Sequence, residues 1–553
     1  MGRASIGELS QESGLQRRRT LTPKRLVAGL GLAAGLVLLT AAPAFAQASD
    51  EVDPVATAQA TADHAIQSSN LMWIVIGAAL VIFMQAGFAL VETGFCRAKH
   101  AAHVVSTNFA IFGLGFVAFF TVGFSFMFGG YSYALPGYDY GYDHALSGGG
   151  PLIGSGNWVF LWKGGWFGTF FDSGHLAYSG AICAFFLYMV AFMDTVATIP
   201  TGSMAERWKW KSFMMWGFFC GAFYYPLFAA WTWGGGWLAK LGNSASWGNG
   251  YVDFAGSGVV HAMGGIAALM GALVLGPRLG KFDKDGKPRA LPGHHIPMAM
   301  LGTFILLFGW FGFNAASTFA SSDPQFGVVA LNTAIAAAFG AMAGMGWIWL
   351  RTGKPDPGMI MNGLLAGLVA ITAPCAFVDP WAAAVIGLIA GVLVVEAVFF
   401  VDHRLHIDDP VGAVGVHFVN GIWGVLAVGI FASGKYGVDA FGTGLGWNST
   451  TTHLDSAGSA TGVTGILYGG TGWGQLGAQA IGAATIIIVM GGFSFAFFKL
   501  SNLLFKGGIR STAEDEIAGL DVPEMGVFAY PDFVGTGESY ADDESPSKVP
   551  YGD

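Results

Sequence analysis

The chain has 553 residues, of which 53% are hydrophobic and only 11% are charged. Soluble domains carry roughly 25% charged residues, so this chain lacks the polar surface that a water-soluble protein needs. The formal net charge of −9 argues against a nucleic-acid partner. The 85 glycines suit helices that pack closely in lipid. The composition therefore predicts an all-α polytopic membrane protein, with the lipid bilayer as its solvent.

The N-terminus has the pattern of a secretory signal peptide over residues 1–46. Three consecutive arginines at 17–19 precede an apolar stretch, and Ala44-Phe45-Ala46 forms a cleavage site of the A-x-A type. The alternative is an uncleaved membrane helix, for which the apolar stretch is short. After cleavage, residues 47–70 form an external N-terminal segment.

Eleven apolar stretches of roughly 20 residues follow, each long enough to span a bilayer. They lie near 71–94, 104–129, 179–204, 212–238, 254–276, 296–320, 326–350, 358–378, 381–401, 411–433 and 475–499. An external N-terminus and an odd number of spans place the C-terminus in the cytoplasm. Most Lys and Arg residues fall in the connections that this topology makes cytoplasmic, which agrees with the positive-inside rule. We therefore expect a multi-pass protein of the bacterial inner (plasma) membrane with a cytoplasmic acidic tail at 506–553.

Two segments of the chain repeat one motif. Asp253 and Asp409 are each followed by a histidine eight residues later, His261 and His417, and then by a Gly-Ile pair. The first motif opens the fifth span and the second opens the tenth, so the two helices run in opposite directions. This pattern is typical of an inverted repeat of five plus five spans, within a transmembrane domain at 71–505. Repeat A then covers about 71–280, repeat B about 295–433, and a last helix about 475–505.

The two histidines are predicted to meet inside the membrane. Each aspartate is expected to cap its helix, with Pro410 at the first helical position. At 1.5 Å per residue, each ring then lies roughly 12 Å from its own membrane face, within a hydrocarbon core of about 30 Å. The alternative is a core histidine satisfied by a backbone carbonyl. Ionisable groups at this depth are rare and usually functional, which favours a functional pair.

Four strings of residues resemble the ammonium transporter family (Amt/Mep/Rh), of the bacterial Amt type. They are MQAGFALVETGFCRAKH at 84–100, DFAGSGVVH at 253–261, GWFGFNAAST at 309–318 and DDPVGAVGVH at 408–417; the tail string EIAGLDVPEMGVFAY at 516–530 adds to them. The resemblance extends from about residue 70 to residue 530. It implies a homotrimer of eleven-span subunits, each with its own narrow pore.

The resemblance also implies roles for individual residues. His261 and His417 match the paired pore histidines, and Phe192 and Phe313 match the external gate. Trp233 and Ser317, together with Phe192, match the ammonium recruitment site, and Asp253 matches the acidic residue at the external mouth. The alternatives are ordinary packing for the phenylalanines, a membrane-interface position for Trp233 and a bond within its own helix for Ser317. We interpret Asp253 and Asp409 as structural and electrostatic residues.

The chain departs from the family pattern at two positions. Asp194 puts a carboxyl group in the third span, where an uncharged residue is expected. Met525 stands where the tail motif has a histidine. The tail at 508–530 is still expected to dock on the cytoplasmic face and to respond to a PII-type nitrogen regulator, the alternative being a solvated acidic tail.

These observations predict a transporter rather than an enzyme. No nucleophile–base pair, metal cluster, phosphate loop or cofactor motif is present in the sequence. The protein is expected to recruit ammonium at the external aromatic and serine site and to deprotonate it. It then conducts ammonia past the histidines, with the proton relayed separately. An ammonium sensor with little flux and a neutral-gas channel for ammonia or carbon dioxide remain as alternatives.

Overall fold

The computed structural model describes residues 54–130, 148–171, 176–435 and 462–531. The chain divides into two compact units, Met1–His64 and Ala65–Asp553. The first unit is described only at residues 54–64, which begin helix α2 (Pro54–Phe95). The predicted signal peptide and its cleavage site lie outside the described residues. Helix α2 begins well before the predicted 71–94 span.

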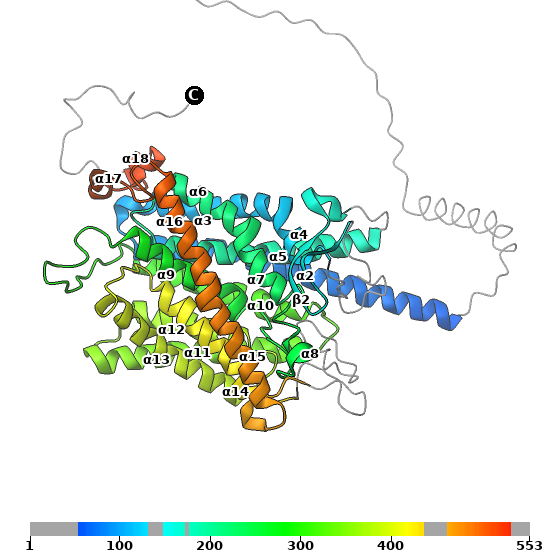
Figure 1. Cartoon of the computed structure of the whole chain (residues 1–553). Helices are drawn as coiled ribbons and strands as arrows, with labels where there is room; N and C mark the ends of the chain where they lie inside the picture. The colour runs from blue at the N-terminus through cyan, green and yellow to red at the C-terminus, as the bar shows by residue number, and fades with distance from the viewer. Residues whose placement is uncertain (1–53, 131–147, 172–175, 436–461, 532–553) are drawn as a thin grey trace, which may run out of the picture. The chain divides into compact units, whose positions relative to one another are not determined.

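Eleven apolar helical segments in the described ranges correspond to the eleven predicted spans (Figure 1). Ten of them are long and apolar enough to cross a membrane, and the eleventh, α12, has 16 residues. The first five are α2, α3–η3–α4 (Ala101–Ala118, Phe119–Gly123, Phe124–Phe128), α5 (Leu176–Ser203), α6–η5–α7 (Trp210–Phe219, Cys220–Tyr224, Tyr225–Trp231) and η6–α9 (Ser257–Ala262, Met263–Leu275). The other six are α10 (Ile296–Asn314), α11 (Gln325–Thr352), α12 (Pro357–Thr372), α13 (Pro380–His403), η8–α14 (Val414–Val419, Asn420–Phe431) and α15–η11–α16 (Gly472–Thr485, Ile486–Met490, Gly491–Leu504). The prediction of an all-helical, multi-span membrane protein is confirmed.

Helices α3–α4 and α6–α7 separate two ends of the bundle. At one end, strands β1 (Gly150–Ser155) and β2 (Trp158–Lys163) form an antiparallel hairpin that contacts α4 and α7. At the other end, the C-terminal segment with α17 (Ala513–Ala518) and α18 (Asp521–Met525) lies against the starts of α3 and α6 (Figure 1). We name these ends the hairpin face and the tail face.

The two repeated motifs form helices that cross in opposite directions. A Cβ added at Gly265 would collide with the backbone nitrogen of Phe418, and one added at Gly421 would lie 2.5 Å from the carbonyl oxygen of Ser257. Gly265 and Gly421 are the matched glycines of the repeat. Each lets its own helix pack directly on the backbone of the other, as small residues do in membrane helix pairs. The crossing places the turns that carry the two histidines side by side.

Each repeated aspartate holds the start of its helix by accepting backbone N–H groups. Asp253 accepts from the N–H groups of Gly256, Gly258 and Val259 at 2.8–2.9 Å. Asp409 accepts from the N–H of Val414 at 2.7 Å. The prediction that Pro410 occupies the first helical position is wrong, because the π-helical turn begins only at Val414. The carboxylate reaches across the intervening turn to satisfy a donor that the helix itself leaves unpaired.

Candidate functional site

His261 and His417 meet at the helix crossing, as the spacing of the repeat predicts. Their Nδ1 atoms lie 3.2 Å apart and their rings are nearly parallel, with centroids 5.3 Å apart. The exposed fraction is 0% for His261 and 6% for His417. Each histidine lies in a π-helical turn, a feature that often marks functional sites in helices. At 3.2 Å the two Nδ1 atoms share one hydrogen, so one ring donates and the other accepts.

The pair leaves the two Nε2 atoms for other partners. Nε2 of His261 is buried and has no hydrogen-bond partner among the described residues. Such orphaned groups are rare in protein interiors and call for an explanation such as a bound ligand or a catalytic role. The ring can therefore take a proton, or offer one, on the side that faces away from His417.

A line of stacked aromatic rings leads to the histidines from the hairpin face. The ring of Trp233 lies edge-on to Phe192, with centroids 5.7 Å apart. Phe192 stacks on Phe313 at 4.1 Å, and Phe313 stacks on the His261 ring at 5.3 Å. All four side chains are at most 2% exposed. The structure therefore brings the residues assigned to the gate and to recruitment into one column that ends at the histidine pair.

Polar contacts hold this column in place. Trp233 donates its indole N–H to the carbonyl oxygen of Asp253 at 2.8 Å. Ser317 donates to the carbonyl oxygen of Phe313 at 2.8 Å, so the bond within its own helix is present. Its hydroxyl also lies 3.0 Å from that of Tyr188. Ser317 keeps lone pairs with which to accept a further hydrogen bond.

Sequence reasoning missed two residues of this site. Tyr188 stacks on Phe192 at 4.8 Å and also donates to the carbonyl oxygen of Gly312 at 2.8 Å. Trp310 stacks on His261 at 4.9 Å and donates to Thr372. Tyr188 lies four residues before Phe192 on the same helix face, which was a usable signal. Trp310 lies inside the GWFGFNAAST string, where the resemblance drew attention to other positions.

Asp194 is buried in α5, at 2% exposure, two residues after Phe192. Its Oδ1 atom has no hydrogen-bond partner in the described part of the chain. Nothing in the structure explains this carboxyl group.

A network of buried charges joins the helix ends at the tail face. Arg278 binds Glu206 through Nη1 at 2.9 Å and Asp408 through Nε at 2.8 Å, and Arg97 binds Glu206 at 2.5 Å. Burial alone raises the pKa of a carboxyl group, but the Arg278 and Arg97 guanidinium groups more than offset it and lower the pKa of Glu206. The same balance, with Arg207 and Arg278, lowers the pKa of Asp408. Both carboxylates therefore stabilise the fold above their unfolded-state pKa, and that contribution is lost only in acid.

The C-terminal segment packs on the tail face through acidic side chains that accept backbone N–H groups. Glu516 accepts from Leu279 at 2.6 Å, and Asp521 accepts from His103 at 2.9 Å. Burial raises the pKa of Asp521, although backbone donors such as the N–H of His103 oppose the shift. The described part of the tail, up to residue 531, is therefore packed on the bundle rather than solvated.

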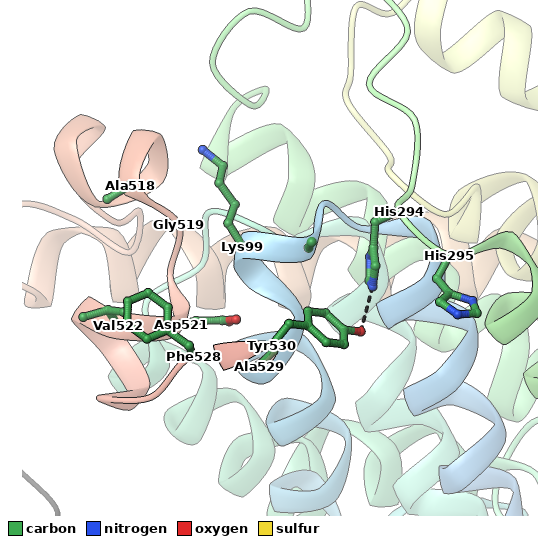
Figure 2. A pocket seen from close by; sticks show the side chains of 11 residues that line it. Lys99, His294, His295, Ala518, Gly519, Asp521, Val522, Phe528, Ala529 and Tyr530 are labelled. Carbon is green, nitrogen blue, oxygen red and sulfur yellow. Dashed lines mark hydrogen bonds between the residues drawn. The ribbon is translucent and has the colours of Figure 1, made fainter. Parts of the chain in front are cut away.

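Tyr530 completes this contact. Its hydroxyl group lies 2.8 Å from Nε2 of His294, the bond drawn in Figure 2. A cavity of about 500 Å³ opens between the tail and the bundle, with Lys99 and His294 on one side and Val522 and Phe528 on the other (Figure 2). The described part of the tail thus contacts the bundle through Glu516, Asp521 and Tyr530, with a hollow beside these contacts.

The fold is that of a multi-span membrane protein, and the site is a column of buried aromatic rings that ends at a buried histidine pair. Among the described residues, no group of three or more His, Cys, Asp or Glu side chains is arranged to hold a metal ion. The model of the Ammonium Transporter Family matches residues 72–530. The chain belongs to the ammonium transporter family, and it is a transporter rather than an enzyme.

Individual relatives agree with this membership. The chain is 42% identical to the ammonium transporter Amt2 of Archaeoglobus fulgidus over 469 residues, which cover 84% of this chain and 89% of the relative. It is 33% identical to ammonium transporter 1 member 3 of Solanum lycopersicum, covering 84% and 93%. Among solved structures, it matches a sensor Amt protein with a TM-score of 0.68 and 33% identity, covering 84% and 99%. It matches Mep2 of Candida albicans with a TM-score of 0.66 and 26% identity, covering 88% and 93%.

Proposed function

We propose that the protein takes up ammonium by removing one proton from it and conducting ammonia past the histidine pair, while the proton crosses by a separate relay. The observation that carries this proposal is the His261–His417 contact at 3.2 Å at the end of the aromatic column. Ammonium and potassium have the same charge and similar size, so a pore of carbonyl groups distinguishes them poorly. A site that demands a proton from its cargo excludes potassium completely.

The approach from the hairpin face suits recruitment of the cation. Trp233 and Phe192 supply aromatic rings, and Ser317 offers a hydroxyl oxygen that accepts a hydrogen bond. Cation–π contacts contribute about 0.5–2 kcal/mol, which concentrates the ion without trapping it. Moving the intact cation deeper into an apolar lumen is far more costly, whereas ammonia avoids most of that penalty.

The two histidines supply polar groups at the end of the aromatic column, where the neighbouring side chains are apolar rings. Ammonia can hydrogen-bond to the imidazole rings as it passes. The hydrogen shared by the two Nδ1 atoms lets a proton that arrives at Nε2 of His261 leave from Nε2 of His417. Ammonia and the proton, the two products of deprotonation, then each have a path across the membrane. Because the proton crosses as well, transport moves charge.

The proposal also includes the orientation of the protein in the membrane and its oligomeric state. Arg97, Arg207 and Arg278 lie at the tail face, which supports a cytoplasmic tail face and an external hairpin face under the positive-inside rule. We retain the bacterial inner membrane, the external N-terminus after signal cleavage and the homotrimer as part of the proposal.

The proposal is tested by growth rescue and by electrical recording. Expression in a strain that lacks its own ammonium uptake is expected to restore growth on low ammonium. Purified protein in liposomes is expected to give an inward current on an ammonium pulse and none on an equal potassium pulse. Equal currents from both ions would contradict deprotonation, and uptake without current would favour a neutral-gas channel for ammonia or carbon dioxide.

A sensor is the second candidate function, and one observation favours it. One of the similar solved structures is that of a protein named "Sensor Amt Protein", and the match covers 99% of that chain. A sensor binds ammonium with little flux, so growth rescue and current separate it from a transporter. Ligand binding without either result would favour the sensor.

The tail contacts support regulation as part of the proposed function. A docked tail that bonds to Leu279 and His103 connects the cytoplasmic surface to the ends of the pore helices. We expect a PII-type nitrogen regulator to bind there, although Met525 replaces the expected histidine. Pull-down of the regulator under low and high nitrogen is expected to succeed with the full chain in one state. A chain that ends at Gly507 is expected to lose this binding. Absence of binding by the full chain in both states would contradict the partner.

A further inference from the structure

Glu92 is a buried carboxyl group that the proposed mechanism does not yet use. It lies in α2, three residues before the helix ends at Phe95, and is 3% exposed. Asn108 donates to its Oε2 atom at 2.7 Å, and Thr201 donates to its Oε1 atom at 2.8 Å. These neutral donors fix the direction of the carboxyl group without supplying a positive charge.

The nearby cations are committed to other carboxylates. Arg97 and Arg278 bind Glu206, and Arg278 also binds Asp408. Among the described residues, the structure records no ion pair to Glu92. A buried carboxyl group is costly unless it is paired, and a structural ion pair does not account for this one.

A small cavity is lined by both Glu92 and His417. It has a volume of about 20 Å³, and its wall includes Glu92, His417 and Asn362 among apolar side chains such as Phe88 and Leu306. A cavity needs roughly 10–15 Å³ and two to four polar partners to hold one water molecule. This cavity therefore has room for a single water molecule, with the imidazole and the carboxyl group both in its wall.

The bonding of His417 determines which atom can use that water. Its Nδ1 is occupied by Nδ1 of His261, so Nε2 is the ring nitrogen left for the cavity. The shared Nδ1 hydrogen therefore links His261 to His417, and the cavity beyond His417 is lined by the carboxyl group of Glu92.

We propose that Glu92 is the proton acceptor on the tail side of the histidine pair, reached from His417 through one water molecule. This inference rests on the proposed function and deepens it. An N–H bond of ammonium breaks and its proton joins Nε2 of His261, while the shared hydrogen moves onto Nδ1 of His417. His417 then releases its Nε2 proton to the water, which passes a proton to the carboxylate. Ammonia leaves neutral, and protonated Glu92 returns its proton to solvent at the tail face.

The test compares two fluxes in the same liposomes that hold the full-length chain. Ammonium-driven current reports the proton path, and internal alkalinisation on an ammonia gradient reports passage of the neutral molecule. Glu92→Gln keeps the size of the side chain but accepts no proton. We expect its current to fall at least tenfold while alkalinisation stays within twofold of the native rate. Glu92→Asp keeps a carboxyl group and is expected to retain more current than Glu92→Gln.

Glu396→Gln is the matched control, because Glu396 lies in α13 as a half-exposed partner of Arg351 outside the pore. It is expected to leave both fluxes unchanged. Native current in Glu92→Gln would overturn the inference. Equal loss of current and alkalinisation would also overturn it, because that result assigns Glu92 a structural role. The variant that lacks both histidines tests the proposed function separately from the role of Glu92. Undiminished selective current in that variant would contradict the proposed function itself.

Discussion

Replacing both His261 and His417 by alanine is expected to abolish the selective ammonium-driven current in proteoliposomes. The two rings are the polar groups recorded at the bottom of the aromatic column, and they share one hydrogen at 3.2 Å. Without them, ammonia loses its hydrogen-bond partners and the proton loses its acceptor in a dry segment. Current is measured on ammonium and potassium pulses with native protein and variant reconstituted at equal density.

His103→Ala is the control for the loss of a buried histidine. His103 is 2% exposed and lies edge-on to Trp210 near the tail face, away from the aromatic column. Its substitution is expected to leave selective current within a factor of two. An undiminished, potassium-excluding current in the double variant would refute the role of the pore pair.

Replacing Phe313 by alanine is expected to reduce the ammonium-driven current about tenfold. The ring stacks on Phe192 at 4.1 Å and on His261 at 5.3 Å and also contacts Trp310, so its removal takes away three ring contacts at once. Without the ring, the groups that lead the ion to His261 lose the contacts that hold them in position, and misplaced groups slow a step that depends on orientation.

Phe124→Ala provides the comparison for packing alone. Phe124 is fully buried in an aromatic cluster with Phe119 and Phe186, outside the column. Both substitutions are expected to lower the thermal stability in detergent, as Phe→Ala changes in cores do. Only Phe313→Ala is expected to lower the current per folded protein. An unchanged transport profile would place Phe313 among the ordinary packing residues.

The sequence by itself determined the membrane class, the eleven apolar segments and the meeting of the two histidines. A bilayer allows few structures, and a span of fixed length with a fixed rise per residue converts position in the chain into depth. The repeated Asp, His and Gly then placed His261 and His417 at similar depths on helices of opposite direction. No knowledge of side-chain packing was needed for that step.

The resemblance selected Phe192 and Phe313 from 46 phenylalanines, but only the tertiary structure decided that their rings stack in one column that ends at His261. Phe192 and Phe313 come from α5 and α10, and contacts between distant helices depend on rotation and packing that a uniformly apolar pattern does not encode. The same reason hid the contact between Trp310 and His261. The first turns after Asp253 and Asp409 also differ from the expected caps, because the helices start later and the carboxylates reach across.

Glu92 shows the difference most clearly. From the sequence it is a residue near the end of the 71–94 span, and nothing in that segment relates it to His417. Its cavity with His417 is formed by side chains of α2, α5, α10, α12 and the segment around η8. A void is a property of how several helices pack together, so no single segment can reveal it. The sequence determined which groups lie in the membrane, and packing decided which of them face one another.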